Sequence, residues 1–246
     1  EFGLIERLTS DLPKNQESTF AGVGDDAAVI DHGAYYQVVT TDLLLEGVHF
    51  DLVYTPLKHL GYKAVVVNLS DVYAMNAAPR QITVSVGISG KFSVEAIEEF
   101  YQGVRLACER FKVDLVGGDT SGSMTGLVIS VTAVGTALKE EITLRSKALP
   151  NQLVCVTGDL GAAFMGLKVL EREKQLHADD PEFQPRLQGY DYLLERFLKP
   201  EPRVDVLLDL KEAGIRIGAM IDISDGLSSD LLHICKSSDC GVQIYD

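Results

Sequence analysis

Apolar and polar positions along the first 140 residues predict strands and helices in alternation. β-Branched and aromatic residues crowd 35–42, and strict alternation marks 81–88, as expected for strands. The run 93–111 opens with Ser93 as an N-cap, has an acidic first turn, and spaces its apolar residues at helical intervals. The predicted strands are 27–30, 35–42, 81–88, 113–119 and 126–138, and the predicted helices are 57–76 and 93–111. This order is typical of an α/β fold, with a mixed sheet covered by helices.

A turn at 147–152 ("KALPNQ") leads into a second unit. In this unit, residues 153–173 are predicted to form a strand, a glycine loop and a helix. A polar connection follows over 177–193, and a helix with a proline break is predicted over 192–214. The segment 217–241 reads as a strand, an acidic turn and a helix capped by Asp225, and a further strand begins at 242. We therefore expect two domains, 1–140 and 147–246, with the second one incomplete.

Composition narrows the class of protein. The 246 residues are 46% hydrophobic and carry a formal net charge of −14, which suits a globular protein and disfavours binding to nucleic acid. No apolar run reaches the ~20 residues that span a bilayer, so we expect no membrane partner. The four cysteines form no CxxC pair and predict small buried thiols in a reducing cytoplasm. His233, Cys235 and Cys240 lack a fourth ligand at zinc-site spacing.

Aspartates recur where apolar segments end. The stretch "GVGDDAAVI" sets Asp25 beside Asp26 just before a predicted strand. Further aspartates end or follow apolar segments at Asp42, Asp71, Asp119, Asp222 and Asp225. Any one of them could simply order a turn or cap a helix. If they converge, their repulsion requires cations, and an oxygen-only ligand set favours Mg²⁺, which commonly bridges carboxylates to phosphates. We therefore hypothesise a site for ATP and several Mg²⁺ ions.

Other candidate motifs leave alternatives open. The glycine-bearing loop 157–166 could offer amides to an anion or could be a structural turn, and it lacks the GK[ST] of a P-loop. Arg145 is either a phosphate ligand or a solvated surface residue. His49 is either a half-buried structural histidine or a substrate contact. No GxSxG or HExxH motif is present, which disfavours triad hydrolases and zinc peptidases.

Several motifs in order resemble the thiamine-monophosphate kinase family, which belongs to the superfamily of aminoimidazole ribonucleotide synthetase. They are "GVGDDAAV", "TTDLLLEGVHF", "YKAVVVNLSDVYAMNAAP", "VGGDTS", "LRSKALPNQLVCVTGDLG", "KPEPR" and "IDISDGLSSDLLHI". The resemblance runs from about residue 2 to the end of the chain. It implies a two-domain α/β fold, a homodimer joined through the N-terminal sheets, and a cleft that holds ATP and several Mg²⁺ ions. Family members continue beyond the length of this sequence.

The resemblance also implies roles for individual residues. It assigns metal binding to Asp26, Thr40, Thr41, Asp42, Asp71, Asp119, Asp222 and Asp225. It assigns ATP binding to Gly118, Asp119, Arg145 and Ser224, and contact with thiamine monophosphate to His49. No residue is expected to act as a general base, and Asp42 and Asp71 are expected to support Mg²⁺-assisted transfer. Where the family often has Asp-Ser-Ala after "TGDLG", this chain has Ala162-Ala163.

The implied reaction is the phosphorylation of thiamine monophosphate to thiamine diphosphate by ATP. Two alternatives stay open. The first is another ATP-dependent enzyme of the superfamily, forming a ring or a selenophosphate, although Cys108 is the first cysteine and lies within a predicted helix. The second is a non-catalytic nucleotide-binding scaffold, which the intact acidic residues Asp42 and Asp119 disfavour.

Overall fold

The computed structural model describes residues 2–180 and 182–245. In chain order its elements are α1 (Phe2–Thr9), β1 (Thr19–Ala21), β2 (Ala28–Asp31), β3 (Tyr36–Leu45), α2 (Leu57–Ala74), β4 (Ala78–Ile88), α3 (Val94–Phe111), β5 (Asp114–Gly122), β6 (Val128–Ala137), the 3₁₀ turn η1 (Arg145–Lys147), α4 (Ala162–Asp179), α5 (Asp191–Leu198), α6 (Val204–Glu212) and α7 (Leu227–Ser237). Every strand and helix predicted within the first 140 residues is confirmed.

The strands form one mixed sheet in the order β1-β2-β3-β6-β4-β5. All neighbouring pairs are antiparallel except β4 and β5, which are parallel and joined through α3. The long central strand β3 pairs with β6 along its whole length, from Tyr36 opposite Ala137 to Leu45 opposite Val128. The predicted mixed sheet is therefore confirmed, and it brings the end of β3 close to α2.

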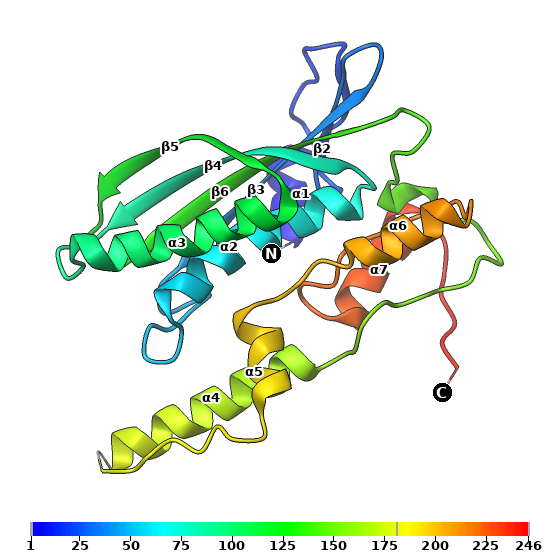
Figure 1. Ribbon diagram of the computed structural model, residues 1–246. Coiled ribbons are helices and arrows are strands. Elements are labelled where there is room, and N and C mark those ends of the chain that lie inside the picture. Colours follow the sequence, from blue (N-terminus) through cyan, green and yellow to red (C-terminus); the bar gives the residue numbers. More distant parts are fainter. Residues whose placement is uncertain (1, 181, 246) are drawn as a thin grey trace.

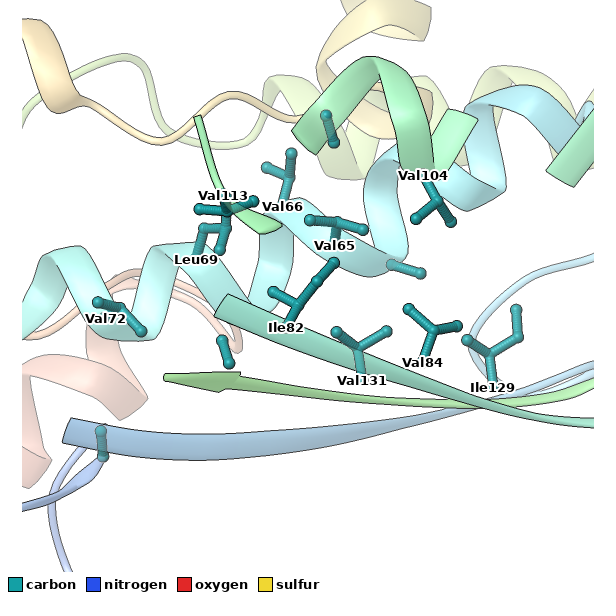
Figure 2. Close-up of a cluster of buried hydrophobic side chains, with 14 of the residues drawn as sticks. Val65, Val66, Leu69, Val72, Ile82, Val84, Val104, Val113, Ile129 and Val131 are labelled. Carbon is teal, nitrogen blue, oxygen red and sulfur yellow. The ribbon is translucent and has the colours of Figure 1, made fainter. Parts of the chain in front are cut away.

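Helices α2 and α3 lie along one face of this sheet (Figure 1). One hydrophobic core contains Val65, Leu69 and Val72 of α2 together with Ile82 of β4 and Ile129 of β6 (Figure 2). Two glycines let the helices cross closely: a Cβ on Gly103 would lie 1.9 Å from the carbonyl oxygen of Lys58, and one on Gly61 would lie 1.9 Å from that of Phe100. Helix α2 is thus buried on most sides, between the sheet and α3.

The second half of the chain is helical in the described residues. Strands predicted at 153–157, 217–221 and from 242 are wrong, because these segments form no backbone ladder with a neighbouring strand. A strand is stable only when its N–H and C=O groups pair with another strand. Leu153 and Ile244 are accordingly 91% and 64% exposed. Helix α4 also continues to Asp179, three residues into the segment predicted as a polar connection.

Three hydrogen bonds connect this half to α2. The Tyr62 hydroxyl donates to Glu201 at 2.7 Å, the Lys63 ammonium donates to the Phe197 carbonyl at 3.2 Å, and the Ser70 hydroxyl donates to Asp222 at 2.8 Å. Near the other end, the Ser238 hydroxyl donates to the carbonyl of Arg145 at 2.6 Å. A domain boundary between residues 140 and 150 stays a prediction.

The cysteines differ from the expectation of buried thiols. Cys155 is exposed, and Cys108, Cys235 and Cys240 are half-buried and free. Cys155 lies in the segment that was expected to be a strand and that forms none, which explains its exposure. Among the described helices, none is long and apolar enough to cross a lipid bilayer.

Candidate functional site

Three aspartates that are far apart in the sequence meet in space. Asp26 precedes β2, Asp71 lies in α2, and Asp222 lies in the turn before α7. Each offers a carboxylate oxygen, and these oxygens all lie within 4.8 Å of one another. A search of the described residues for three or more histidine, cysteine or acidic side chains close enough to share one metal ion finds this group. The possible zinc ligands His233, Cys235 and Cys240 form no such group.

Arg145 supplies the positive charge beside the Asp25–Asp26 pair. Its guanidinium is a fork that donates to both carboxylate oxygens of Asp26, from Nη2 and, at 3.1 Å, from Nε. Its backbone N–H donates to Asp25 at 3.1 Å, and the Asp26 N–H also donates to Asp25 at the same distance. Asp25 therefore orders the turn, while Asp26 presents its carboxylate to Arg145 and to the other two aspartates.

Asp71 and Asp42 are held by polar side chains on β3 and α2. The Thr40 hydroxyl donates to Asp71 at 2.7 Å. Asn68, one turn before Asp71 on α2 and 1% exposed, accepts the backbone N–H of Asp42 at 3.0 Å. Its amide group donates in turn to the Ala64 carbonyl at 3.0 Å. The end of β3 is therefore fixed against the same helix that carries Asp71.

The turn before α7 carries Asp222, Ser224 and Asp225. Asp222 faces Asp26 and Asp71, whereas the side chains of Ser224 and Asp225 are exposed. The prediction that Asp225 caps α7 is wrong: the helix begins after Gly226, whose φ of 130° suits glycine, and its N-cap makes no side-chain hydrogen bond. The backbone N–H groups of Ser224 and Gly226 instead donate to Asp230.

Burial and crowding make this cluster hold protons. Burial, together with the charges of Asp222, Asp42 and Asp26, raises the pKa of Asp71 to about 8. Burial also raises the pKa of Asp25 to about 6 and, with the charge of Asp26, raises that of Asp222. Burial raises the pKa of Asp26 as well, although its bonds to Arg145 oppose the shift. A cation placed among these groups would displace the protons and relieve the repulsion.

Gly118, Asp119 and Thr41 lie apart from the cluster. Asp42, Val131, Val84 and Gly118 stand opposite one another on four adjacent strands, so Asp42 and Gly118 are three strand spacings, or ~14 Å, apart. Gly118 is needed there, because a Cβ would lie 1.8 Å from the Val84 carbonyl oxygen. The exposed Thr41 hydroxyl donates to the Val131 carbonyl, on the face of the sheet opposite Thr40. Ligand roles for these three residues stay predictions.

His49 lies in the loop after β3, beside a separate cavity of about 390 Å³. The cavity is bounded by residues 47–51 and Tyr54 on one side and by α4 and Phe197 of α5 on the other. The His49 Nδ1 accepts the backbone N–H of Leu45 at 3.0 Å, which fixes the ring and leaves Nε2 available as a donor. Burial raises the pKa of Asp42, and His49 lies within electrostatic reach of that carboxylate, which links this loop to the acidic cluster.

Sequence reasoning missed the side chains that hold the carboxylates. Asn68 and Ser70 were unassigned, although both are polar residues within the otherwise apolar run "KAVVVNLSDVYA" of α2. A polar side chain on a buried helix requires a hydrogen-bond partner. That requirement is the signal that could have identified them.

Comparison with known proteins identifies the class to which this sheet belongs. Residues 24–137 match the family described as AIR synthase related protein, N-terminal domain. Across its whole length, the chain is 35% identical to thiamine-monophosphate kinase of Bacillus subtilis (strain 168), of which it covers 73%. Over 99% of its length it is 34% identical to thiamine-monophosphate kinase of Escherichia coli (strain K12), of which it covers 71%.

Solved structures agree with these relatives. The chain superimposes with a TM-score of 0.81 on AaThiL complexed with AMPPCP and TMP, at 33% identity, covering 97% of this chain and 70% of that one. Thiamine-monophosphate kinase from Stenotrophomonas maltophilia K279a gives a TM-score of 0.72 at 34% identity, covering 97% of this chain and 72% of that one. The chain belongs to the thiamine-monophosphate kinase family. The predicted family and α/β fold are therefore confirmed.

Proposed function

We propose that this protein transfers the γ-phosphoryl group of ATP to the phosphate of thiamine monophosphate, giving ADP and thiamine diphosphate. The observation that carries the proposal is the convergence of Asp26, Asp71 and Asp222 in a chain of this family. Phosphoryl transfer between two anions depends mainly on positioning and on neutralising charge. Three carboxylates on three different elements are suited to hold the cations that do this.

The donor set fits Mg²⁺. All the convergent ligand atoms are carboxylate oxygens, which hard divalent cations prefer. Burial and the neighbouring carboxylates raise the pKa of Asp71, and a bound cation would favour its charged form. Asp26, Asp71 and Asp222 would hold the ion, with Asp42 within electrostatic reach. Bound there, Mg²⁺ would neutralise phosphate oxygens of ATP. The other proposed ligands are Thr40, Thr41, Asp119 and Asp225 for metal, and Gly118, Asp119, Arg145 and Ser224 for ATP.

The acceptor needs no general base. A phosphate monoester has a second pKa near ~6, so it is already mostly ionised at neutral pH and can attack directly. His49 is suited to orient this acceptor, because its ring is fixed by Leu45 and it borders the cavity between the 47–54 loop and α4. We therefore assign His49 a positioning role and assign the cavity to the acceptor.

An ADP-release assay tests the proposed reaction. The protein is incubated with ATP and Mg²⁺ together with thiamine monophosphate, thiamine or no acceptor, and compared with Asp71→Asn and with the control Asp209→Asn on the exposed face of α6. We expect release that requires thiamine monophosphate, that disappears in Asp71→Asn, and that persists in the control. Release only with another acceptor would refute the thiamine assignment and favour another ATP-dependent enzyme. Measurable ATP binding without release would favour a scaffold.

The role of His49 has its own test. Because the residue is proposed to orient the acceptor, His49→Ala should raise the KM for thiamine monophosphate while leaving the KM for ATP close to that of the wild type. A loss of kcat at saturating acceptor, with an unchanged acceptor KM, would instead indicate a role in the chemical step.

We also propose a homodimer joined through the N-terminal sheet. The edge strand β5 is exposed at all nine residues, and it carries Leu115 and Val116 at 44% and 61% exposure. An unpaired strand edge with exposed apolar side chains favours pairing with another chain. Light scattering coupled to gel filtration would give the mass, and a monomer at assay concentration would refute the dimer.

The four free cysteines are consistent with a cytoplasmic location.

A further inference from the structure

Asp230 is a buried carboxylate to which the mechanism above assigns no role. It lies in the first turn of α7 and is only 3% exposed. One of its oxygens, Oδ2, accepts two backbone N–H groups, from Ser224 at 3.1 Å and from Gly226 at 3.0 Å. A buried carboxylate that accepts two main-chain donors fixes the backbone that carries them.

The backbone so fixed is the turn that bears Asp222. Among the hydrogen bonds of the described residues, the backbone amides of Ser224 and Gly226 have no acceptor other than Asp230. Asp222 lies two residues before Ser224, and the Ser70 hydroxyl of α2 holds its carboxylate from the other side at 2.8 Å. The position of Asp222 is therefore set twice, by Ser70 from α2 and by Asp230 through the turn.

We propose that Asp230 is a positioning residue for the acidic cluster, whose hydrogen bonds to the 224–226 backbone hold Asp222 against Asp26 and Asp71. The inference rests on the proposed function in one respect, that Asp222 is a metal ligand. Asp230 itself touches neither metal nor substrate.

Binding of Mn²⁺ in the absence of nucleotide and acceptor tests this role, since it reports on the cluster alone. Residues whose hydrogen bonds orient the ligands of a metal are typically worth about 10- to 100-fold in metal affinity, so Asp230→Ala should weaken Mn²⁺ binding by that factor. Asp230→Asn keeps an acceptor oxygen but loses the charge, so it should weaken binding by about fivefold. The control Asp209→Ala, on α6, should bind Mn²⁺ like the wild type.

A purely structural cap would behave differently. It would lower the melting temperature in both Asp230 variants but leave the Mn²⁺ affinity of the folded protein unchanged, and that result would overturn the inference. If Asp230→Ala does not fold, Asp230→Asn decides: wild-type affinity for Mn²⁺ overturns the inference, and the expected loss supports it. Wild-type protein that binds no Mn²⁺ also overturns it. Normal Mn²⁺ behaviour without phosphorylation of thiamine monophosphate would refute the proposed function alone.

Discussion

Replacing Arg145 with glutamine tests whether the guanidinium serves as the resident cation of the acidic site. The Asp26 side chain is fully buried, and that of Arg145 is 16% exposed. Removing one partner of a buried ion pair typically costs about 3–5 kcal/mol, because the remaining charge is left without compensation. Arg145→Gln should therefore destabilise the metal-free protein, while Arg145→Lys, which keeps the charge but loses the fork, should destabilise it less.

Protonation limits the size of this loss. An uncompensated Asp26 can take up a proton, and for a carboxyl with an unfolded pKa of ~3.9 this costs about 1.4 kcal/mol per pH unit, or about 4 kcal/mol near pH ~7. The expected loss near neutral pH is thus about 3–4 kcal/mol, or roughly 6–16 °C in melting temperature for a chain of this size. At pH ~5 the cost of protonating Asp26 falls to about 1–2 kcal/mol, so the difference in stability between Arg145→Gln and the wild type should become smaller.

Thermal unfolding in EDTA and in Mg²⁺, each at both pH values, measures these quantities. Since Mg²⁺ can replace the missing positive charge, the rise in melting temperature on adding Mg²⁺ should be larger for Arg145→Gln than for the wild type. If Arg145 has its proposed role in binding ATP phosphate, the same variant should also bind ATP more weakly. Equal melting temperatures in EDTA, or equal gains with Mg²⁺, would refute the view that Arg145 compensates Asp26.

Two further predictions concern the scaffold. Burial lowers the pKa of Lys63 to about 8, whereas the unfolded chain has a pKa of ~10.4, because the folded protein favours the neutral amine. The stability that this residue contributes is therefore present above the unfolded pKa and is lost as the pH falls through 8. Denaturant titrations should therefore show wild-type stability rising relative to Lys63→Met between about pH 8 and 10, and parallel curves would contradict the shift. Gly103→Ala would force a Cβ against the Lys58 carbonyl and should lower the free energy of unfolding by about 1–3 kcal/mol. The control Gly90→Ala, whose Cβ meets no atom within 4 Å, should leave it unchanged in the same titration. Equal stability of the two variants would show that α2 and α3 separate freely.

The helices and strands of the first half could be predicted from the sequence, because each buries one face in the core between the sheet and the helices, and this burial produces a regular apolar period. Alternation in 81–88 corresponds directly to β4, and helical spacing in 93–111 corresponds to α3. The buried side chains of both elements belong to one hydrophobic core. The apolar segments at 153–157 and 217–221 carry the same local signal but have no strand beside them in the described chain. Local pattern cannot supply a hydrogen-bonding partner, and for that reason these predictions failed.

The site was predictable as a set of acidic positions but not as a geometry. The sequence shows that aspartates follow apolar segments, and the structure brings three of them together. It does not show that Arg145 reaches across 119 residues to Asp26, or that Ser70 reaches across 152 residues to Asp222. Those contacts depend on how separate elements pack, and no periodicity records this.

Helix α2 explains how the protein can hold like charges so close together. Its core-facing residues, such as Leu69 and Val72, are fully buried on the sheet, while the adjacent Ser70 and Asp71 face the cluster. Side chains fixed on a rigid, well-packed element cannot move apart to relieve repulsion. The cluster must therefore be compensated by protons, by Arg145 or by a bound cation, and these three compete for the same carboxylates. Under the proposed function, a divalent ion would bind here most strongly by replacing the protons, and Arg145 would then be free for an incoming phosphate.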